Sequence, residues 1–363
     1  MSALGEHAAA LAALPGAGSV RLGRLLAHDD AEAAWHTVLA GRVPAEVAPS
    51  PVRAGWKVAA AETDLDAVRD DLRRAGVTAT TWHHPAHPPQ FVRDIDPAPA
   101  AFRRGVLPDP SLPHVAIVGT RRASGIGKEI ARELGAGLAD AGVVVVSGLA
   151  LGIDAAAHQG ALLAAATPPV AVVGSGCDVP YPKANASLWE RIASAGAVLG
   201  EAPLGARPEP WRFPARNRLI VAMSDLVVVV ESRSAGGSLL TVDEAVRRGI
   251  DVMAVPGSLR NGAAAGANRL LADGCAPVLE TGDIIEALGL DRCGAAARRS
   301  AGPQRAAVGD TAAQVLDAID DGPTSIDELV TRTQVDAATV FAALTELELG
   351  GHITHDGARV RRC

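Results

Sequence analysis

The segment VAIVGTRRASGIGKEIARELG, residues Val115–Gly135, decides the fold prediction. An apolar run leads into a glycine-marked turn that a helical pattern follows, which is how a dinucleotide-binding fold begins. The glycines fall at positions 119, 125 and 127, however, and Arg121 and Arg122 lie inside the turn. Because this spacing departs from G-x-G-x-x-G, the segment predicts a phosphate-binding α/β fold without fixing its ligand.

Further apolar runs of strand length recur between His114 and Leu290, with helical segments between them. The runs are VAIVG (115–119), VVVVSG (143–148), VAVVG (170–174), AVLGE (197–201), LVVVVE (226–231) and DVMAVPG (251–257). Such alternation is typical of parallel strands covered on both faces. Residues 114–290 are therefore predicted to form a Rossmann-like, doubly wound, mostly parallel sheet, with its ligand at the carboxyl ends of the strands.

The residues before this sheet divide into two predicted parts. Residues 1–84 carry Ala and Leu at helical spacing and predict a small helical domain. Within it, LPGAGSVRLGRLL (14–26) resembles half of a helix-hairpin-helix, whose turn either offers backbone N–H groups to a phosphate or simply joins two packed helices. Residues 85–113 are rich in proline and predict an extended connector packed on the sheet domain.

The residues after the sheet also divide into two predicted parts. Small, polar and basic residues over 291–309 predict a flexible linker. Residues 310–363 contain three helical patterns, a capping box of Ser325 with Glu328, and a final strand–turn–strand. This order predicts a winged helix-turn-helix domain.

Composition restricts the class of protein. The longest apolar run, residues 226–230, is too short to span a membrane, and Glu6 stands where a secretion signal needs basic residues. The four cysteines lack metal-ligand spacing, which argues against structural zinc and suits a reduced cytoplasm. We therefore expect a cytoplasmic protein that neither contacts a membrane nor carries a metal.

The net charge of −7 is unevenly distributed. Residues 308–363 hold ten acidic and four basic side chains, which leaves 31 acidic and 30 basic groups in residues 1–307. The main body is thus nearly neutral and leaves room for a local basic groove. The acidic tail is a poor match for phosphates, apart from its RVRR end (359–362).

Three common nucleotide cofactor sites are missing their key residues. The second strand ends at Ser147-Gly148 without the acid that holds a dinucleotide ribose. The single tyrosine, Tyr181, has no lysine four residues on, and Gly127-Lys128 is followed by Glu129 rather than Ser or Thr. The sequence therefore predicts no bound cofactor.

Several glycine-rich strand ends and separately placed cations remain. One small ligand needs one such strand end, whereas several of them along an edge suit an extended chain of phosphates. The predicted DNA-binding residues are Gly119, Thr120, Arg121, Arg122, Ser147, Gly148, Gly174, Gly176, Lys183, Asn185, Arg216, Asn217, Arg218, Gly237 and Ser238.

Each of these candidates has a structural alternative. Gly148 could simply form a tight turn, and the Arg216–Arg218 segment could clamp neighbouring carbonyl groups. Glu201 and Glu231 at strand ends could act as general bases, although neither has a partner at a motif spacing. Arg121 and Lys183 are the strongest candidates, because a charge inside a glycine turn has little structural purpose.

Six motifs, in order, resemble the DNA-processing protein A family (DprA, also called Smf) over roughly Pro85–Leu290. They are GTRRAS, SGLALGIDAAAH, GSGCDVPYPKAN, FPARNRLI, VVVVESRSAGGSLLT and AVPGSLRNGAAAGANRLLADG. The resemblance implies a non-catalytic protein that binds single-stranded DNA and loads the recombinase RecA onto it during natural transformation. It also implies a homodimer formed through about residues 268–288.

The resemblance also assigns roles at the site. Arg121 and Lys183 would be the main cations, and Gly119, Thr120, Asn185, Arg216 and Asn217 would line the same groove. Leu151 stands where the family usually has an arginine, so one electrostatic contact is missing. Aromatic residues make up only 3% of the chain, and those near the groove are Tyr181, Trp211 and Phe213.

Two other functions stay open. AGGSLLTVDEA (235–245) has the outline of a motif in related folds that hydrolyse nucleoside monophosphates, with Glu244 shifted in register. Alternatively, the winged helix would make the protein a regulator that binds duplex DNA, against which the acidity of the tail argues.

Overall fold

The six apolar runs form parallel strands of one sheet, as predicted. The computed structural model describes residues 5–164, 166–290, 310–319, 324–349, 353–356 and 359–362. The six strands are β3 (His114–Val118), β4 (Val144–Ser147), β5 (Val170–Val172), β6 (Ala197–Gly200), β7 (Leu226–Val229) and β8 (Asp251–Ala254). Their order in the sheet is β6-β5-β4-β3-β7-β8.

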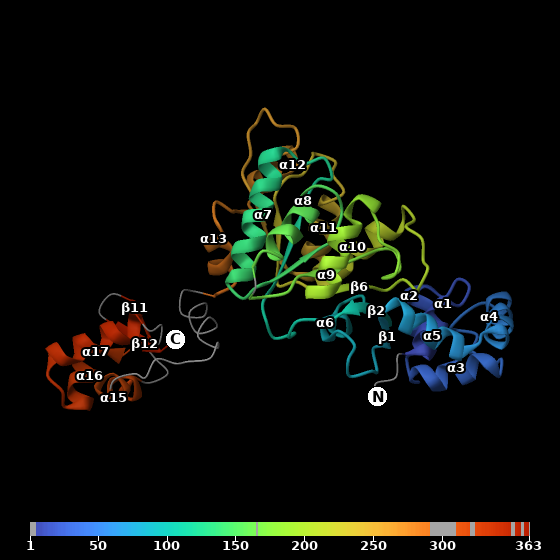
Figure 1. The fold of residues 1–363 in the computed structure, drawn as a ribbon, viewed down its shortest axis with the longest axis horizontal. Coiled ribbons are helices and arrows are strands. Elements are labelled where there is room, and N and C mark those ends of the chain that lie inside the picture. The colour runs from blue at the N-terminus through green and yellow to red at the C-terminus, as the bar shows by residue number, and fades with distance from the viewer. Residues whose placement is uncertain are drawn as a thin grey trace. The chain divides into compact units, whose positions relative to one another are not determined.

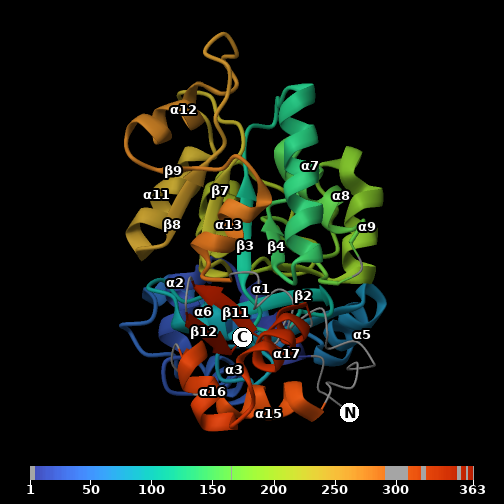
Figure 2. The same ribbon diagram turned by 90° about the vertical axis from the view of Figure 1, so that its left-hand side faces the viewer.

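Helices cover both faces of this sheet, so its strands are apolar throughout. Val170 and Val172 of β5 face one core cluster, whereas Ala171 and Val173 face the other. Figure 2 shows α7, α8 and α9 on one side of the sheet and α11 and α12 on the other. The helices that follow β3 to β8 in turn are α7 (Gly125–Asp140), α8 (Ile153–Ala161), α9 (Ala186–Ala195), α10 (Arg212–Ala222), α11 (Leu239–Arg248) and α12 (Ala265–Ala272).

The strand order creates one topological switch point. From β3 the chain builds outward through β4, β5 and β6, and then returns to place β7 on the other side of β3. Ligands of doubly wound sheets bind where the order reverses, outside the carboxyl ends of the strands. The carboxyl ends of β3 and β7 are therefore the centre of the candidate site.

Three further strands extend the sheet to nine in the described residues. Strands β1 (Val77–Thr81) and β2 (Ala100–Gly105) add to β6 as an antiparallel pair, and β9 (Ala276–Pro277) adds to β8. The prediction of an extended connector over residues 85–113 is therefore wrong for β2. The prolines flank β2 without entering it, so its backbone N–H groups are free to pair on both sides.

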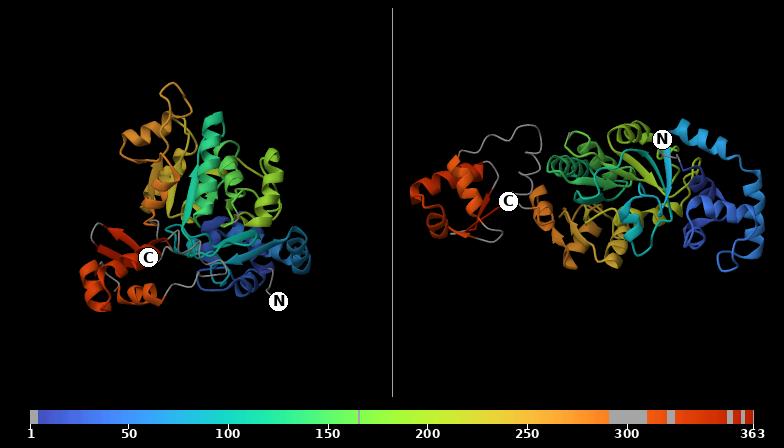
Figure 3. Two further views of the ribbon diagram at one scale, coloured as in Figure 1. Left: turned by 60° about the vertical axis from the view of Figure 1, so that its left-hand side comes forward. Right: turned by 90° about the horizontal axis from the view of Figure 1, so that it is seen from below.

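The predicted N-terminal helices are present and pack against β1 and β2 (Figures 1 and 3). Trp35 and Trp56 are buried among them, and the sheet and these helices form one compact unit that ends at Asp283. The helices are α1 (Glu6–Ala13), α2 (Gly18–Leu25), α3 (Ala31–Leu39), α4 (Ser50–Glu62) and α5 (Leu65–Ala75), and a short α6 (Pro89–Arg93) precedes β2.

The C-terminal unit contains the predicted winged helix. Helix α16 begins with the predicted capping box, in which Glu328 N donates to Ser325 Oγ at 3.3 Å and Ser325 N donates to Glu328 Oε2 at 2.9 Å. Its elements are α15 (Asp310–Ala318), β10 (Thr324–Ser325), α16 (Ile326–Thr333), α17 (Ala337–Leu349), β11 (Ile353–Asp356) and β12 (Arg359–Arg362). The predicted linker, residues 291–309, lies outside the described residues.

Helix α13 (Thr281–Ala287) follows the last strand of the large sheet. No helix in the described ranges combines the length and apolar character that a membrane-spanning segment requires.

His87, between β1 and α6, makes the stability of the large unit depend on pH. Its side chain is buried beside Thr80 Oγ1, 3.1 Å from Nδ1, and burial lowers the pKa of His87 from 6.5 to about 4. The unfolded chain therefore binds more protons than the folded chain between these values. We expect the free energy of unfolding to fall by up to about 3 kcal/mol as pH drops from about 6.5 to about 4.

Urea unfolding of wild type and His87→Gln at several pH values checks this. We expect His87→Gln to be less stable than wild type at pH 7.5, and its free energy of unfolding to depend less steeply on pH. If the free energy of unfolding depends on pH equally steeply in the variant and in wild type, folding does not lower the pKa of His87.

Candidate nucleic-acid interface

The turn after β3 is held tightly against the ends of β7 and α8. Thr120 N donates to the Glu231 carbonyl oxygen at 2.7 Å. A Cβ at Gly119 would lie 2.5 Å from Ile153 Cγ1 and 2.7 Å from the same carbonyl oxygen, so only glycine fits. The turn thereby leaves the sheet in a fixed direction and projects the exposed Arg121 and Arg122 from its end.

The start of α7, where a Rossmann fold holds a pyrophosphate, is occupied by a side chain of this protein. Glu231 Oε2 accepts from Ser124 N at 2.8 Å, and Oε1 accepts from Ser124 Oγ at 2.6 Å and from Asn261 Nδ2 at 2.9 Å. A Cβ at Gly127 would lie 2.4 Å from the Glu231 carboxyl carbon. This carboxylate already provides the anion that a helix N-terminus attracts, which argues against a dinucleotide.

Replacing Glu231 with alanine should destabilise the large unit by about 1–3 kcal/mol, because the donors at Ser124 and Asn261 lose their acceptor. Chemical unfolding measures the loss. Glu129→Ala, at an exposed position of α7, is the matched control and should change stability by less than about 0.5 kcal/mol. Equal losses in the two variants would contradict a capping role for Glu231.

Arg121 forms an exposed cluster with two aromatic rings. Its guanidinium carbon lies 5.3 Å from the centroid of the Phe213 ring, at the start of α10. The Tyr181 ring centroid lies 5.3 Å from that of Phe213, with the two planes tilted by 33°. We call these three residues the Arg121 platform, since they present a cation and ring surface together.

Lys183 belongs to the same region. It follows Tyr181 by two residues and begins the 3₁₀ turn Lys183–Asn185, where its side chain is exposed. Tyr181 itself is 39% exposed and precedes a cis proline, Pro182. The two cations that the sequence singles out are therefore both at the surface, Arg121 beside the aromatic pair and Lys183 two residues after Tyr181.

Arg216 and Arg218 are buried, which corrects the expectation that they supply surface cations. Arg216 Nη1 donates to the Gly148 carbonyl oxygen at 2.8 Å and to that of Val172. Arg218 pairs with Glu201 and donates to the Asp96 carbonyl oxygen at 2.8 Å. Arg216 thus fastens the end of β4 to the end of β5, the clamping role that the sequence left open.

Asn185 is a second clamp. Its Nδ2 donates to the carbonyl oxygens of Leu149 at 2.9 Å and Ala150 at 3.3 Å. Leu149 has a φ of 56°, an unusual value for a residue with a side chain. Asn185 therefore helps to hold a strained turn at the end of β4 instead of facing solvent.

Most of the other predicted glycines and serines also have internal roles. The N–H of Gly148 bonds Asp154 Oδ2 at 3.2 Å and that of Gly176 bonds the Ala206 carbonyl oxygen at 2.9 Å, so neither is free for a phosphate. Ser147 Oγ donates to the Ile117 carbonyl oxygen at 2.6 Å, and Ser238 Oγ to Ser232 Oγ at 2.8 Å. Gly174 is buried, whereas Asn217 is half-buried and Gly237 is exposed.

Buried charges beneath this edge stay matched. Burial raises the pKa of the Asp154 carboxyl group, which the positive charge of Arg216 opposes. Burial also lowers the pKa of Arg216 to about 10, so its guanidinium remains charged at neutral pH. His158 lies nearby, and burial together with the Arg216 charge lowers its pKa to about 3, which keeps it neutral. Arg216 therefore stays charged beside Asp154, and the pair holds this part of the sheet edge together.

The acids that could serve catalysis are paired. Glu201 bonds Arg218, and Glu244 bonds Arg247 at 3.0 Å and also pairs with Arg248. Glu231 holds Ser124, the N-cap residue of α7, a role that the sequence did not suggest, although an acid directly after a strand at the switch point is a usable signal. Leu151 is 42% exposed in the turn before α8, so the missing arginine leaves an apolar surface there.

The described residues thus form a nine-stranded Rossmann-like sheet whose carboxyl edge carries exposed cations and aromatic rings, an arrangement suited to a phosphate-bearing ligand. The family model of DNA recombination-mediator protein A matches residues 78–289, and that of the DprA winged helix domain matches residues 299–357. The chain therefore belongs to the DNA recombination-mediator protein A family.

Two relatives are similar to this chain in sequence. The putative DNA processing protein DprA of Mycobacterium tuberculosis strain H37Rv is 39% identical over 239 residues, which cover 65% of this chain and 61% of that protein. Protein Smf of a Synechocystis species is 34% identical over 69% of this chain and 70% of its own length.

Two solved structures are similar to parts of this chain. The structure of DNA processing protein A from Streptococcus pneumoniae superposes with a TM-score of 0.65 at 27% identity, covering 79% of this chain and 98% of that chain. The protein from Helicobacter pylori, whose structure concerns its single-stranded DNA binding mode, gives a TM-score of 0.53 at 29% identity over 59% of this chain and 96% of that chain.

Proposed function

We propose that this protein binds single-stranded DNA at the carboxyl edge of its sheet and acts there without catalysis. The Arg121 platform carries the proposal, because it combines an exposed cation with ring surface, and Lys183 lies in the same region. Base stacking and phosphate contacts are the two elements of sequence-tolerant single-strand binding. The Helicobacter pylori relative, studied for its single-stranded DNA binding mode, supports this ligand.

The finer role that we propose is recombination mediation: loading RecA onto incoming single strands during natural transformation. Membership in the mediator family supports this role. We also propose a homodimer through about residues 268–288. Leu279 in that segment is 77% exposed, which supports an apolar contact there.

The hydrolase alternative is weakened by Glu244. A nucleoside monophosphate hydrolase needs a carboxylate free to act on its substrate. Glu244 instead pairs with Arg247 and with Arg248, which is itself paired with Asp94. The carboxylate is therefore held by two guanidinium groups and is not free to act on a substrate.

The duplex-regulator alternative is weakened by charge at the start of α17. In a helix-turn-helix the N-terminal residues of the third helix approach the bases and phosphates of the major groove. Asp336 stands directly before α17 and accepts from Thr339 N at 3.1 Å. A carboxylate at this end repels phosphates, so we propose a regulatory or protein-binding role for the winged helix.

Fluorescence anisotropy with labelled oligo-dT, duplex DNA and AMP tests the proposal. We expect preference for the single strand and a linear fall of log affinity with log salt, at about −0.7 per phosphate contact. Tight binding of AMP with no response to the polymer, or turnover of a nucleoside monophosphate, would favour the hydrolase instead. Preference for duplex would favour the regulator.

A further inference from the structure

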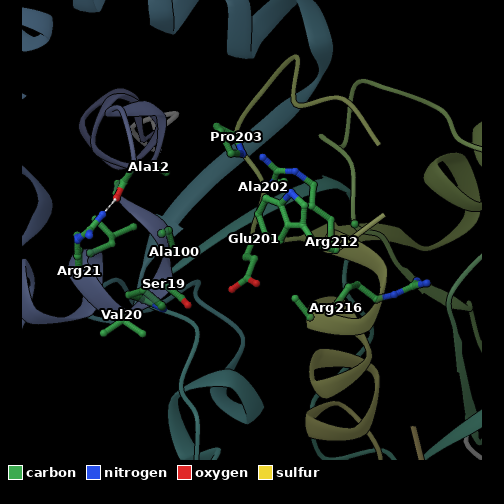
Figure 4. Close-up of a pocket in the computed structure, with 18 of the residues that line it drawn as sticks. Ala12, Ser19, Val20, Arg21, Ala100, Glu201, Ala202, Pro203, Arg212 and Arg216 are labelled. Atoms are coloured by element: carbon green, nitrogen blue, oxygen red, sulfur yellow. Dashed lines mark hydrogen bonds between the residues drawn. The ribbon is translucent and has the colours of Figure 1, made fainter. Parts of the chain in front are cut away.

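A cleft beside the Arg121 platform has no role in the function proposed so far. Its volume is about 1060 Å³, and it separates the turn between α1 and α2 from the strand ends around Val173–Gly174 and Glu201–Pro203. Figure 4 shows Arg21 and Val20 on one side of it and Arg212 on the other. Pockets for drug-sized ligands measure about 300–1,000 Å³, so the cleft is at the upper end of that range.

Five arginines and three acids line this cleft, so its lining carries a net positive charge. Asp96 and Glu201 pair with Arg218, and Glu244 pairs with Arg247 and Arg248. In residues 5–164 and 166–290, by contrast, neither Arg24 nor Arg212 has a carboxylate within ion-pair distance. The charge left over in the cleft is therefore positive, which suits an anionic ligand.

Trp211 adds ring surface to the cleft. It is 59% exposed, and the guanidinium carbon of Arg212 lies 4.6 Å from the centroid of its ring. The chain has five tryptophans; Trp35, Trp56 and Trp189 are buried, and Trp82 is half-buried. An exposed indole beside an arginine repeats the chemistry of the Arg121 platform, and stacking on such a ring is sequence-tolerant.

The platform and the cleft share one short segment. Trp211 and Arg212 line the cleft, and the next residue, Phe213, carries the Arg121 guanidinium on its ring. A polymer bound at Phe213 therefore has its neighbouring units beside the opening of the cleft. A single mononucleotide would use only one of the two sites.

We propose that the cleft is a second stretch of the single-strand track, in which Trp211 stacks a base while Arg24 and Arg212 contact phosphates. The inference rests on the proposed single-strand binding and extends it to the N-terminal helices. The wall contributed by the turn between α1 and α2 makes these helices part of the DNA-binding surface.

Titration with oligo-dT of about 4 to about 20 nucleotides tests the inference. Oligonucleotides long enough to extend beyond the Arg121 platform into the cleft should quench the tryptophan fluorescence of the wild-type protein. The Trp211→Phe substitution should remove that quenching. In Arg24→Glu combined with Arg212→Glu, affinity for the short oligonucleotides should stay the same and affinity for the long ones should fall about tenfold or more. The salt slope for long strands should become shallower by about 1.4, the value for two phosphate contacts.

The outcomes separate the two proposals. If wild type binds no oligonucleotide, the proposed function itself fails. If wild type binds but Trp211 does not respond, or the double variant loses affinity equally at all lengths, the extended track is wrong and the platform stands. Quenching of Trp211 by thymidine monophosphate as strong as by the polymer would also overturn the inference. The quenching of wild-type fluorescence tests the extended track without any variant, so the test stands even if a variant folds poorly.

Discussion

Arg121→Glu combined with Lys183→Glu is expected to lower the affinity for single-stranded DNA by about 100-fold or more, roughly 2.7 kcal/mol. Both side chains are exposed, and Arg121 lies over the Phe213 ring where a base would stack. Each reversal replaces an attraction for phosphate with a repulsion. The salt slope should also become shallower by about 1.4, because two phosphate contacts are lost.

The double variant should remain folded. Arg121 and Lys183 have no ion pair within residues 5–164 and 166–290, so their replacement breaks no salt bridge there. Circular dichroism and urea unfolding should match wild type to within about 0.5 kcal/mol, as for other surface substitutions. Anisotropy with oligo-dT then reports binding alone.

Lys57→Glu combined with Arg191→Glu is the matched control. Both positions are exposed on helices, α4 and α9, and the change in net charge is the same. This control should bind oligo-dT within about threefold of wild type at physiological salt, where screening acts beyond about 8 Å. Similar losses in the two double variants would mean that net charge, and not the Arg121 platform, drives binding.

The sequence predicted the central sheet well because its strands are covered on both faces. A run such as LVVVV needs burial throughout, so it signals a parallel strand before any pairing is known. Strands β1, β2 and β9 carry no such signal. β1 (VTATT) is rich in threonine, β2 (AAFRRG) contains two arginines and is flanked by prolines, and β9 has two residues. They become strands only because an edge of the sheet is available for pairing.

The site residues also divide into those whose position a local sequence pattern predicts and those for which it does not. A glycine turn at a strand end predicts where the site lies, and Arg121 and Lys183 are found at the surface there. Whether an arginine in FPARNRLI faces solvent or the interior depends on contacts far away in the chain. Arg216 meets carbonyl oxygens 68 and 44 residues away, and no local pattern contains that information.

Arg216→Met is expected to destabilise the large unit by about 3–5 kcal/mol, the cost of removing one member of a buried charged network. The substitution leaves the carbonyl oxygens of Gly148 and Val172 without this donor. It also removes the larger of the two positive charges, those of Arg216 and Arg121, that oppose the effect of burial on the Asp154 carboxyl group. Urea unfolding gives the loss, and anisotropy corrected for the folded fraction should give an oligo-dT affinity within about threefold of wild type, well under the 1.4 kcal/mol of a tenfold change. A stable variant that loses DNA binding would instead make Arg216 a ligand contact.

Adding Asp154→Asn to Arg216→Met should recover part of the lost stability. Asparagine keeps an oxygen that can accept from Gly148 N, as Asp154 does at 3.2 Å, but it carries no charge to be left uncompensated. Asp154→Asn alone should be destabilising, because Arg216 then loses the nearby charge that favours its protonated form. The two substitutions are therefore expected to be non-additive by about 1 kcal/mol or more in a double-mutant cycle. Additive losses would mean that the two groups do not interact, and that the carbonyl bonds alone explain why Arg216 is buried.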